Sequence, residues 1–106
     1  MGNRGQVHVR DNGIFMYTHC GRSEMLGNVK EVLVANKNRW KDADKMTNEI
    51  SKVMECDAIG NTFTYCYQII SLDFKYKMVE IIDYPTSQDM RKERIMTFDE
   101  FLTVEE

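Results

Sequence analysis

The stretch QVHVRDNGIFMYTH, residues 6–19, decides the fold because it combines a turn signal with two runs of alternating side chains. Asn12-Gly13 separates the runs, and both residue types tolerate the positive φ angles of a type I′ turn. The pattern therefore predicts a β-hairpin with a two-residue loop. Its register would oppose Asp11 to Ile14, Arg10 to Phe15, Val9 to Met16, His8 to Tyr17 and Gln6 to His19.

Alternation along these two strands predicts one apolar face and one polar, aromatic face. The apolar face carries aliphatic and thioether side chains, with Cys20 on the same side if the strand reaches it: Val7, Val9, Ile14 and Met16. The opposite face carries cationic, imidazole and aromatic groups: Arg4, Gln6, His8, Arg10, Phe15, Tyr17 and His19.

Two helices are expected after the hairpin. Ser23 is the predicted N-cap of the first, since a serine hydroxyl accepts a bond from an orphan amide. Its apolar stripe has helical spacing and comprises Leu26, Val29, Val32, Leu33 and Trp40, the last more typical of the core than of a ligand site. Asp42 or Asp44 is expected to cap the second helix. That helix carries the apolar stripe Ala43, Met46, Ile50, Val53 and Met54.

The second half of the chain reads mostly as strands. Residues 57–61 are expected to break the pattern, residues 62–70 to form a strand and residues 71–75 a turn. Residues 76–84 form the next predicted strand, ended by Pro85, and residues 94–97 a short final strand. Thr97 and Glu100 have the spacing of a capping box, which predicts a short C-terminal helix docked by Phe98, Phe101 and Leu102.

This order predicts a single α+β domain over residues 1–106. The sheet is expected to be mostly antiparallel, with an N-terminal β-hairpin, two central helices, C-terminal strands and a short C-terminal helix. The length of 106 residues and the 42% hydrophobic content suit one packed core.

Charge and cysteine content narrow the function classes. A net charge of −3 with dispersed lysines and arginines argues against nucleic acid as the main partner. The three cysteines (Cys20, Cys56 and Cys66) do not form a disulfide framework, which favours a reducing cytoplasm. Neither a membrane helix nor a signal peptide is expected from the sequence.

Catalytic and metal signatures are weak. His19 and Cys20 are neighbours, so in a strand they point to opposite faces and do not form a dyad. No cysteine or histidine spacing matches a metal site, so we expect neither a metal nor a cofactor. The sequence also has no glycine-rich phosphate loop and no nucleophile elbow, which leans against an enzyme without deciding it.

Five segments occur in the order MGNRGQVHV, GIFMYTHCG, NRWKDADKM, TYCYQIIS and MTFDEF. Together they resemble a family of small uncharacterised proteins of bacteria and their phages, with a Met-Gly-Asn-Arg start and a Tyr-Thr-His-Trp motif. The family's tryptophans are replaced by Cys20 and Met96. The residues that match are Gly2, Asn3, Arg4, Tyr17, Thr18, His19, Arg39, Trp40, Phe98 and Phe101. The resemblance implies that a shared site would use Tyr17 and His19 rather than a cysteine.

Two functions follow as hypotheses. The first is a small cytoplasmic, non-catalytic protein that acts by protein–protein contact with a partner or with itself as a homodimer. The resemblance suggests a phage or mobile-element inhibitor of a host factor as one form of it. The alternative is a binder of a small molecule or nucleotide, or a minimal enzyme, that uses the face of Arg10, Tyr17 and His19. The candidate contact residues are Arg4, His8, Arg10, Tyr17, His19 and Arg22.

Overall fold

The computed structural model describes residues 4–18, 22–54, 58–61, 68–83 and 92–103, and it confirms the α+β class. The strands are β1 (Gly5–Val9), β2 (Ile14–Thr18), β3 (Ala58–Gly60), β4 (Gln68–Asp73), β5 (Met78–Asp83) and β6 (Lys92–Thr97). The helices are α1 (Arg22–Ala35), the 3₁₀ turn η1 (Lys37–Arg39), α2 (Ala43–Met54) and α3 (Phe98–Thr103).

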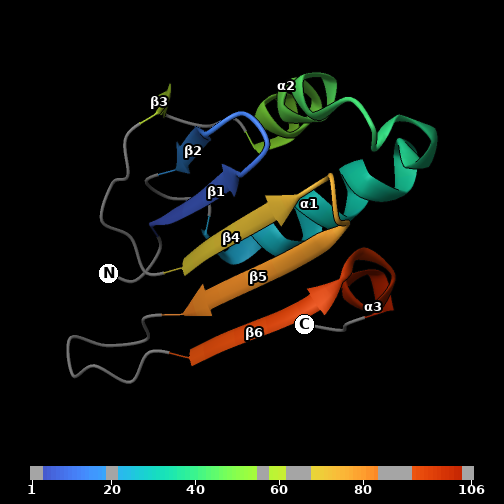
Figure 1. Ribbon diagram of the computed structural model, residues 1–106. Coiled ribbons are helices and arrows are strands. Elements are labelled where there is room, and N and C mark those ends of the chain that lie inside the picture. Colours follow the sequence, from blue (N-terminus) through green and yellow to red (C-terminus); the bar gives the residue numbers. More distant parts are fainter. Residues whose placement is uncertain (1–3, 19–21, 55–57, 62–67, 84–91, 104–106) are drawn as a thin grey trace.

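The described strands form a six-stranded sheet in the order β3-β2-β1-β4-β5-β6, with the helices on one face (Figure 1). Neighbouring strands run antiparallel except for β1 and β4, which pair in parallel at the centre of the sheet. The parallel pair requires a long crossover, and α1 and α2 supply it. One sheet therefore joins the N-terminal hairpin to the C-terminal strands.

The helix-facing side of the sheet is the core. Val7, Val9 and Met16 are fully buried there, as the alternation of the hairpin predicts. They pack with residues of the later strands and the helices, among them Ile70, Leu72, Val79, Ile81, Met25, Val29, Leu33, Met46, Ile50, Phe98 and Phe101. The division of the hairpin into an apolar and a polar face is therefore correct within the described residues.

The predicted hairpin register is wrong. Val9 lies opposite Ile14, and His8 lies opposite Phe15. The loop therefore contains the four residues Arg10–Gly13 instead of two. Because the pairing is displaced by two positions along one strand, each side chain keeps its predicted face.

Side-chain bonds of the loop explain the longer turn. Gly13 has φ +73°, whereas Asn12 is not in the left-handed region that a type I′ turn would demand of it. The Asn12 amide instead accepts a bond from Ile14 N (3.1 Å) and donates to Asp44 Oδ1 (2.9 Å) and Thr47 Oγ1 (3.1 Å). These bonds to α2 stabilise the longer loop in place of the two-residue turn that the Asn-Gly dipeptide alone would favour.

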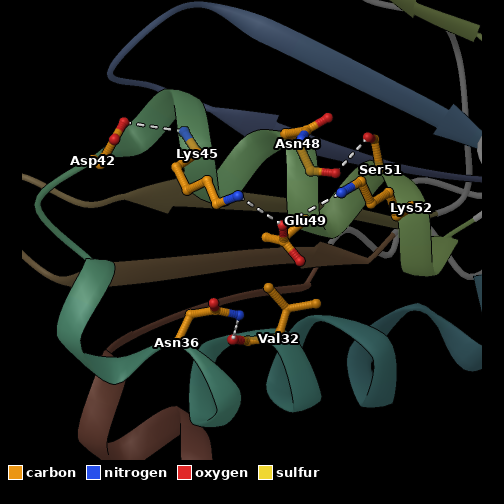
Figure 2. A network of polar contacts seen from close by, with 8 residues as sticks. All are labelled: Val32, Asn36, Asp42, Lys45, Asn48, Glu49, Ser51 and Lys52. Carbon is orange, nitrogen blue, oxygen red and sulfur yellow. Dashed lines mark hydrogen bonds and ion pairs between the residues drawn. The ribbon is translucent and has the colours of Figure 1, made fainter.

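The expected ends of α1 need correction. α1 begins at Arg22, one residue before the predicted N-cap Ser23. Trp40 lies beyond the helix, after η1, and its indole Nε1 donates to the Leu33 carbonyl at 3.0 Å. Figure 2 shows a second bond of this kind, from the Asn36 amide to the Val32 carbonyl. The indole thus satisfies the Leu33 carbonyl, whereas the Val32 carbonyl also accepts a bond from Asn36 N at 3.1 Å.

The second helix follows its prediction closely. Asp42 caps α2, since its carboxylate accepts a bond from Lys45 N at 3.1 Å (Figure 2). Lys45 and Lys52 both approach Glu49 on the solvent side of α2. The hydrogen bond from Lys45, followed by the charge of Lys52, lowers the pKa of Glu49.

Two expectations for the second half are wrong. Ala58–Gly60 is the short edge strand β3 and not a break, because it pairs with β2. β4 continues through Ser71, Leu72 and Asp73, where a turn was expected, because β1 and β5 hold it from both sides. The turn comes later, at residues 74–77, so the next strand begins at Met78 and not at residue 76 as predicted. The other predicted strand residues, 62–67, lie outside the described residues.

The C-terminal predictions are confirmed. The short final strand exists and is longer than expected, Lys92–Thr97. Thr97 and Glu100 form the capping box, with Thr97 N donating to Glu100 Oε1 (2.9 Å) and Glu100 N donating to Thr97 Oγ1 (3.1 Å). Phe98 and Phe101 are buried as predicted. Among the described residues, no helix is long and apolar enough to cross a membrane.

Candidate functional site

The strand register places one residue from each of five adjacent strands in a line on the outer face, the face of the sheet turned away from the helices. This outer row runs Phe15, His8, Ser71, Glu80, Ile95, from β2 to β6. Alternation puts these side chains opposite the core residues of the same strands. The outer row therefore holds both aromatic and polar groups within one continuous surface.

His8 lies against Phe15 at one end of the row. The two rings are stacked, with centroids 4.1 Å apart and an interplanar angle of 5°. Burial, and secondly the positive charge of Arg10, lowers the pKa of His8 below its ordinary value of 6.5. Both effects favour the uncharged imidazole, which stacks on Phe15 as a flat ring.

Arg10 reaches from the hairpin loop to Glu80 on β5. Its guanidinium forms an ion pair with the Glu80 carboxylate, and the side chains of the two residues are 48% and 18% exposed. The backbone of Arg10 is held as well, since its N–H donates to the Leu72 carbonyl at 2.8 Å. Arg10 is thus fixed over the outer face, with much of its charge compensated.

A hollow of about 130 Å³ lies beside this ion pair. It is lined by Arg10, Ser71, Met78, Val79, Glu80 and Ile95. Ile95 is 67% exposed, an unusual setting for a large aliphatic side chain on a sheet. Sites for drug-sized ligands and cofactors occupy roughly 300–1,000 Å³, so this hollow suits one side chain better than a nucleotide.

Tyr17 occupies the next line of the outer face. It lies opposite Gln6 on β1, and its ring packs against Ile69 and Ile82. These two isoleucines are nearly buried although they lie on the outer face. Tyr17 therefore belongs to a small apolar cluster next to the outer row.

The structure brings together only part of the predicted contact set. His8 and Arg10 lie around the outer row, and Tyr17 lies one line away. Arg4 is exposed just before β1, and Arg22 begins α1. His19 and all three cysteines lie outside the described residues.

Three residues of the site were missed by sequence reasoning: Ser71, Glu80 and Ile95. Period-two alternation in residues 78–83 places Glu80 on a face with Met78 and Ile82. That signal does not say which face lies beside the hairpin. The parallel pairing of β1 with β4 decides it, and no local pattern encodes that pairing.

Two arrangements used in catalysis were looked for among the described residues of the site. His8 lies opposite Ser71, yet no hydrogen bond joins their side chains, and a nucleophile–base pair needs contact at roughly 2.6–3.2 Å. Likewise, no group of three or more His, Cys, Asp or Glu side chains within the described ranges could hold a metal ion.

Comparison with known proteins adds no relative. No family model matches this chain, and neither a curated protein nor a solved structure matches it.

Proposed function

We propose that this chain is a small, non-catalytic binding protein that contacts another protein through the outer face of its sheet. The observation that carries the proposal is the hollow beside exposed Ile95, which has the size of a single side chain. Interface energies concentrate where an anchor side chain enters such a pocket. The surrounding surface has the corresponding composition, with Phe15, Tyr17, Met78 and Arg10.

The small-ligand alternative has less support. Arg10, its main anion-binding group, is already paired with Glu80. Tyr17 packs on isoleucines one line away from the hollow, and the hollow is smaller than a nucleotide site. A ligand there would have to displace the Glu80 carboxylate from Arg10, which costs charge-assisted hydrogen bonding.

The proposal includes the cellular compartment, the source and the partner that are expected from the sequence. The protein would act in a reducing cytoplasm, because its cysteine content does not indicate a disulfide framework. The resemblance described above suggests a phage or mobile element as its source and a host factor as its partner. A second copy of the chain is the other partner to test.

Affinity capture with two matched variants tests the proposal. Tagged wild-type protein, Ile95→Glu and Val34→Glu are used to capture partners from a lysate of the cell that expresses it. Val34 is 53% exposed on α1, so its change introduces the same charge away from the outer face. Captured proteins are quantified by mass spectrometry, and the oligomeric state is measured by analytical ultracentrifugation.

We expect one partner to be enriched by wild type and by Val34→Glu and to be lost with Ile95→Glu. Equal enrichment by all three proteins would contradict the proposal. So would a monodisperse monomer that captures nothing reproducibly.

A further inference from the structure

We propose that the outer edge of β6 accepts an extended, acidic segment of the partner as an added strand. This inference rests on the proposed function and names the chemistry of the partner. Peptides that add a strand to a sheet gain affinity from main-chain hydrogen bonds and specificity from pockets for alternate side chains. The edge of β6 offers main-chain groups, and Ile95 on the same strand borders the hollow.

β6 is the last strand of the described sheet, and no described strand pairs with its far side (Figure 1). The residues of β6 that direct their main-chain groups away from β5 can be identified from Phe98. The Phe98 N–H donates to the Lys77 carbonyl, just before β5, at 2.9 Å. Because main-chain groups alternate along an antiparallel strand, those of Ile95 and Thr97 point away from β5. The Thr97 N–H is held by Glu100, so the outward donor on which the inference rests is the Ile95 N–H.

The side chains at this edge specify the partner. Arg94 is 47% exposed, and its guanidinium lies 3.7 Å from the Asp83 carboxylate, a loose contact. On the opposite face, Ile95 borders the hollow. A strand placed beside β6 would therefore set an acidic residue next to Arg94 and an apolar residue next to Ile95.

A second copy of β6 fits this edge poorly. Antiparallel pairing centred on Arg94 would oppose two guanidinium groups, which is destabilising. Pairing centred on Ile95 would oppose Thr97 to Glu93 and would need the Thr97 N–H that Glu100 already occupies. Charge and capping thus favour a different chain over self-association through β6.

Two synthetic peptides of equal length test the inference. One alternates valine with glutamate and the other alternates valine with lysine, both with blocked ends. Each is titrated into ¹⁵N-labelled wild-type protein. The protein carries a net charge of −3, so nonspecific attraction would favour the lysine peptide.

We expect the glutamate peptide to bind more tightly and to shift and protect the Ile95 amide. Arg94→Glu should reverse the preference, with a change of about tenfold or more in the ratio of the two Kd values. Lys52→Glu is the matched control, because Lys52 is exposed on α2 and its reversal should leave the ratio unchanged.

Removing one N–H tests the strand geometry itself. Ile95→Pro deletes the outward donor without touching the ladder to β5, whereas Ile95→Val keeps it. We expect the proline variant to lose binding and the valine variant to retain it. Should the proline variant unfold, protection of the Ile95 amide in the wild-type complex decides the same point.

Equal affinity for both peptides, shifts confined to other elements, or a wild-type dimer built through β6 would overturn the inference. The two proposals fail separately. Suppose that Ile95→Glu abolishes capture of the partner but the Ile95 amide stays unprotected in the complex of that partner with the wild-type protein. Strand addition at β6 is then wrong, and the proposed binding through the outer face is retained. If the peptide adds to β6 but no captured protein depends on Ile95, the proposed function is wrong.

Discussion

The imidazole of His8 and the ring of Phe15 lie parallel, with centroids 4.1 Å apart, across the first two strands of the sheet. This contact joins β1 to β2 on the outer face, opposite the described helices. It also places a titratable imidazole, whose pKa is lowered by burial, within a packed surface.

The stack makes stability depend on pH. The folded pKa of His8 is lowered from 6.5, so between the two values the unfolded chain binds more protons. We therefore expect the free energy of unfolding of the wild type to fall as pH drops below 6.5. In His8→Gln, which has no titrating group at this position, the free energy of unfolding should depend less steeply on pH. Urea unfolding from pH 5 to pH 8 measures the slopes. An NMR titration that places His8 at or above 6.5 would refute the prediction.

Replacing Gly13 by alanine is expected to destabilise the protein through backbone strain and not through a steric clash. The φ of Gly13 is +73°, and nothing lies within 4 Å of the site of an added Cβ. Gly13→Ala should cost about 1 kcal/mol from the left-handed backbone. Gly60→Ala is the matched control, since Gly60 also has open space but no positive φ. Similar unfolding free energies for both variants would mean that the turn geometry is wrong.

Asp11 ties the hairpin loop to the turn between β4 and β5. Its carboxylate accepts bonds from Phe74 N (2.8 Å) and Lys75 N (3.0 Å). Asp11→Ala should destabilise the protein by about 1–2 kcal/mol, because two amides lose a charged acceptor. Glu31→Ala, at an exposed position of α1, serves as the control in chemical denaturation. A loss no larger than that of Glu31→Ala would argue against the tie.

Trp40 is expected to stabilise the end of α1 through its indole N–H as well as its packing. Trp40→Phe keeps a ring near Phe98, whose centroid lies 4.9 Å away, but leaves the buried Leu33 carbonyl without its donor. We expect a loss of about 1–3 kcal/mol in thermal or urea unfolding. Tyr76→Phe, on an exposed tyrosine, should change little. Equal effects of the two substitutions would contradict this role for Trp40.

The capping box should behave as a unit. Thr97→Ala and Glu100→Ala should each cost about 1 kcal/mol, and the double variant less than the sum, because each residue bonds the other's main chain. A double-mutant cycle by urea unfolding measures the coupling. Strict additivity would show that the two bonds form independently.

Local signals in the sequence predicted much of the fold. Alternation separated Val7 and Met16 from His8 and Tyr17, and Asp42 and Thr97 marked the starts of α2 and α3. Each of these features depends on neighbours within a few residues. These predictions are correct because the tertiary contacts at these positions favour the same local structure as the sequence does.

The errors arose where distant contacts decide the structure. The loop Arg10–Gly13 is longer than its dipeptide indicated because Asn12 bonds to Thr47 on α2. Ser71 lies in a strand because β1 and β5 flank it. Local propensity contains no information on either partner.

The candidate site was predicted in part for the same reason. His8 and Arg10 follow from the hairpin alone, since its alternation fixes their face. Ser71, Glu80 and Ile95 join them only through the order of the strands. The hollow beside Ile95 therefore had no sequence signature of its own.

The parallel pair at the centre of the sheet has a consequence for synthesis on the ribosome. β1 pairs early with β2, but its other side must wait for β4, which is translated only after both central helices. During that interval the apolar hairpin exposes an edge to other nascent chains, the condition under which strands aggregate. The yield of native protein should accordingly depend on how promptly the C-terminal strands emerge.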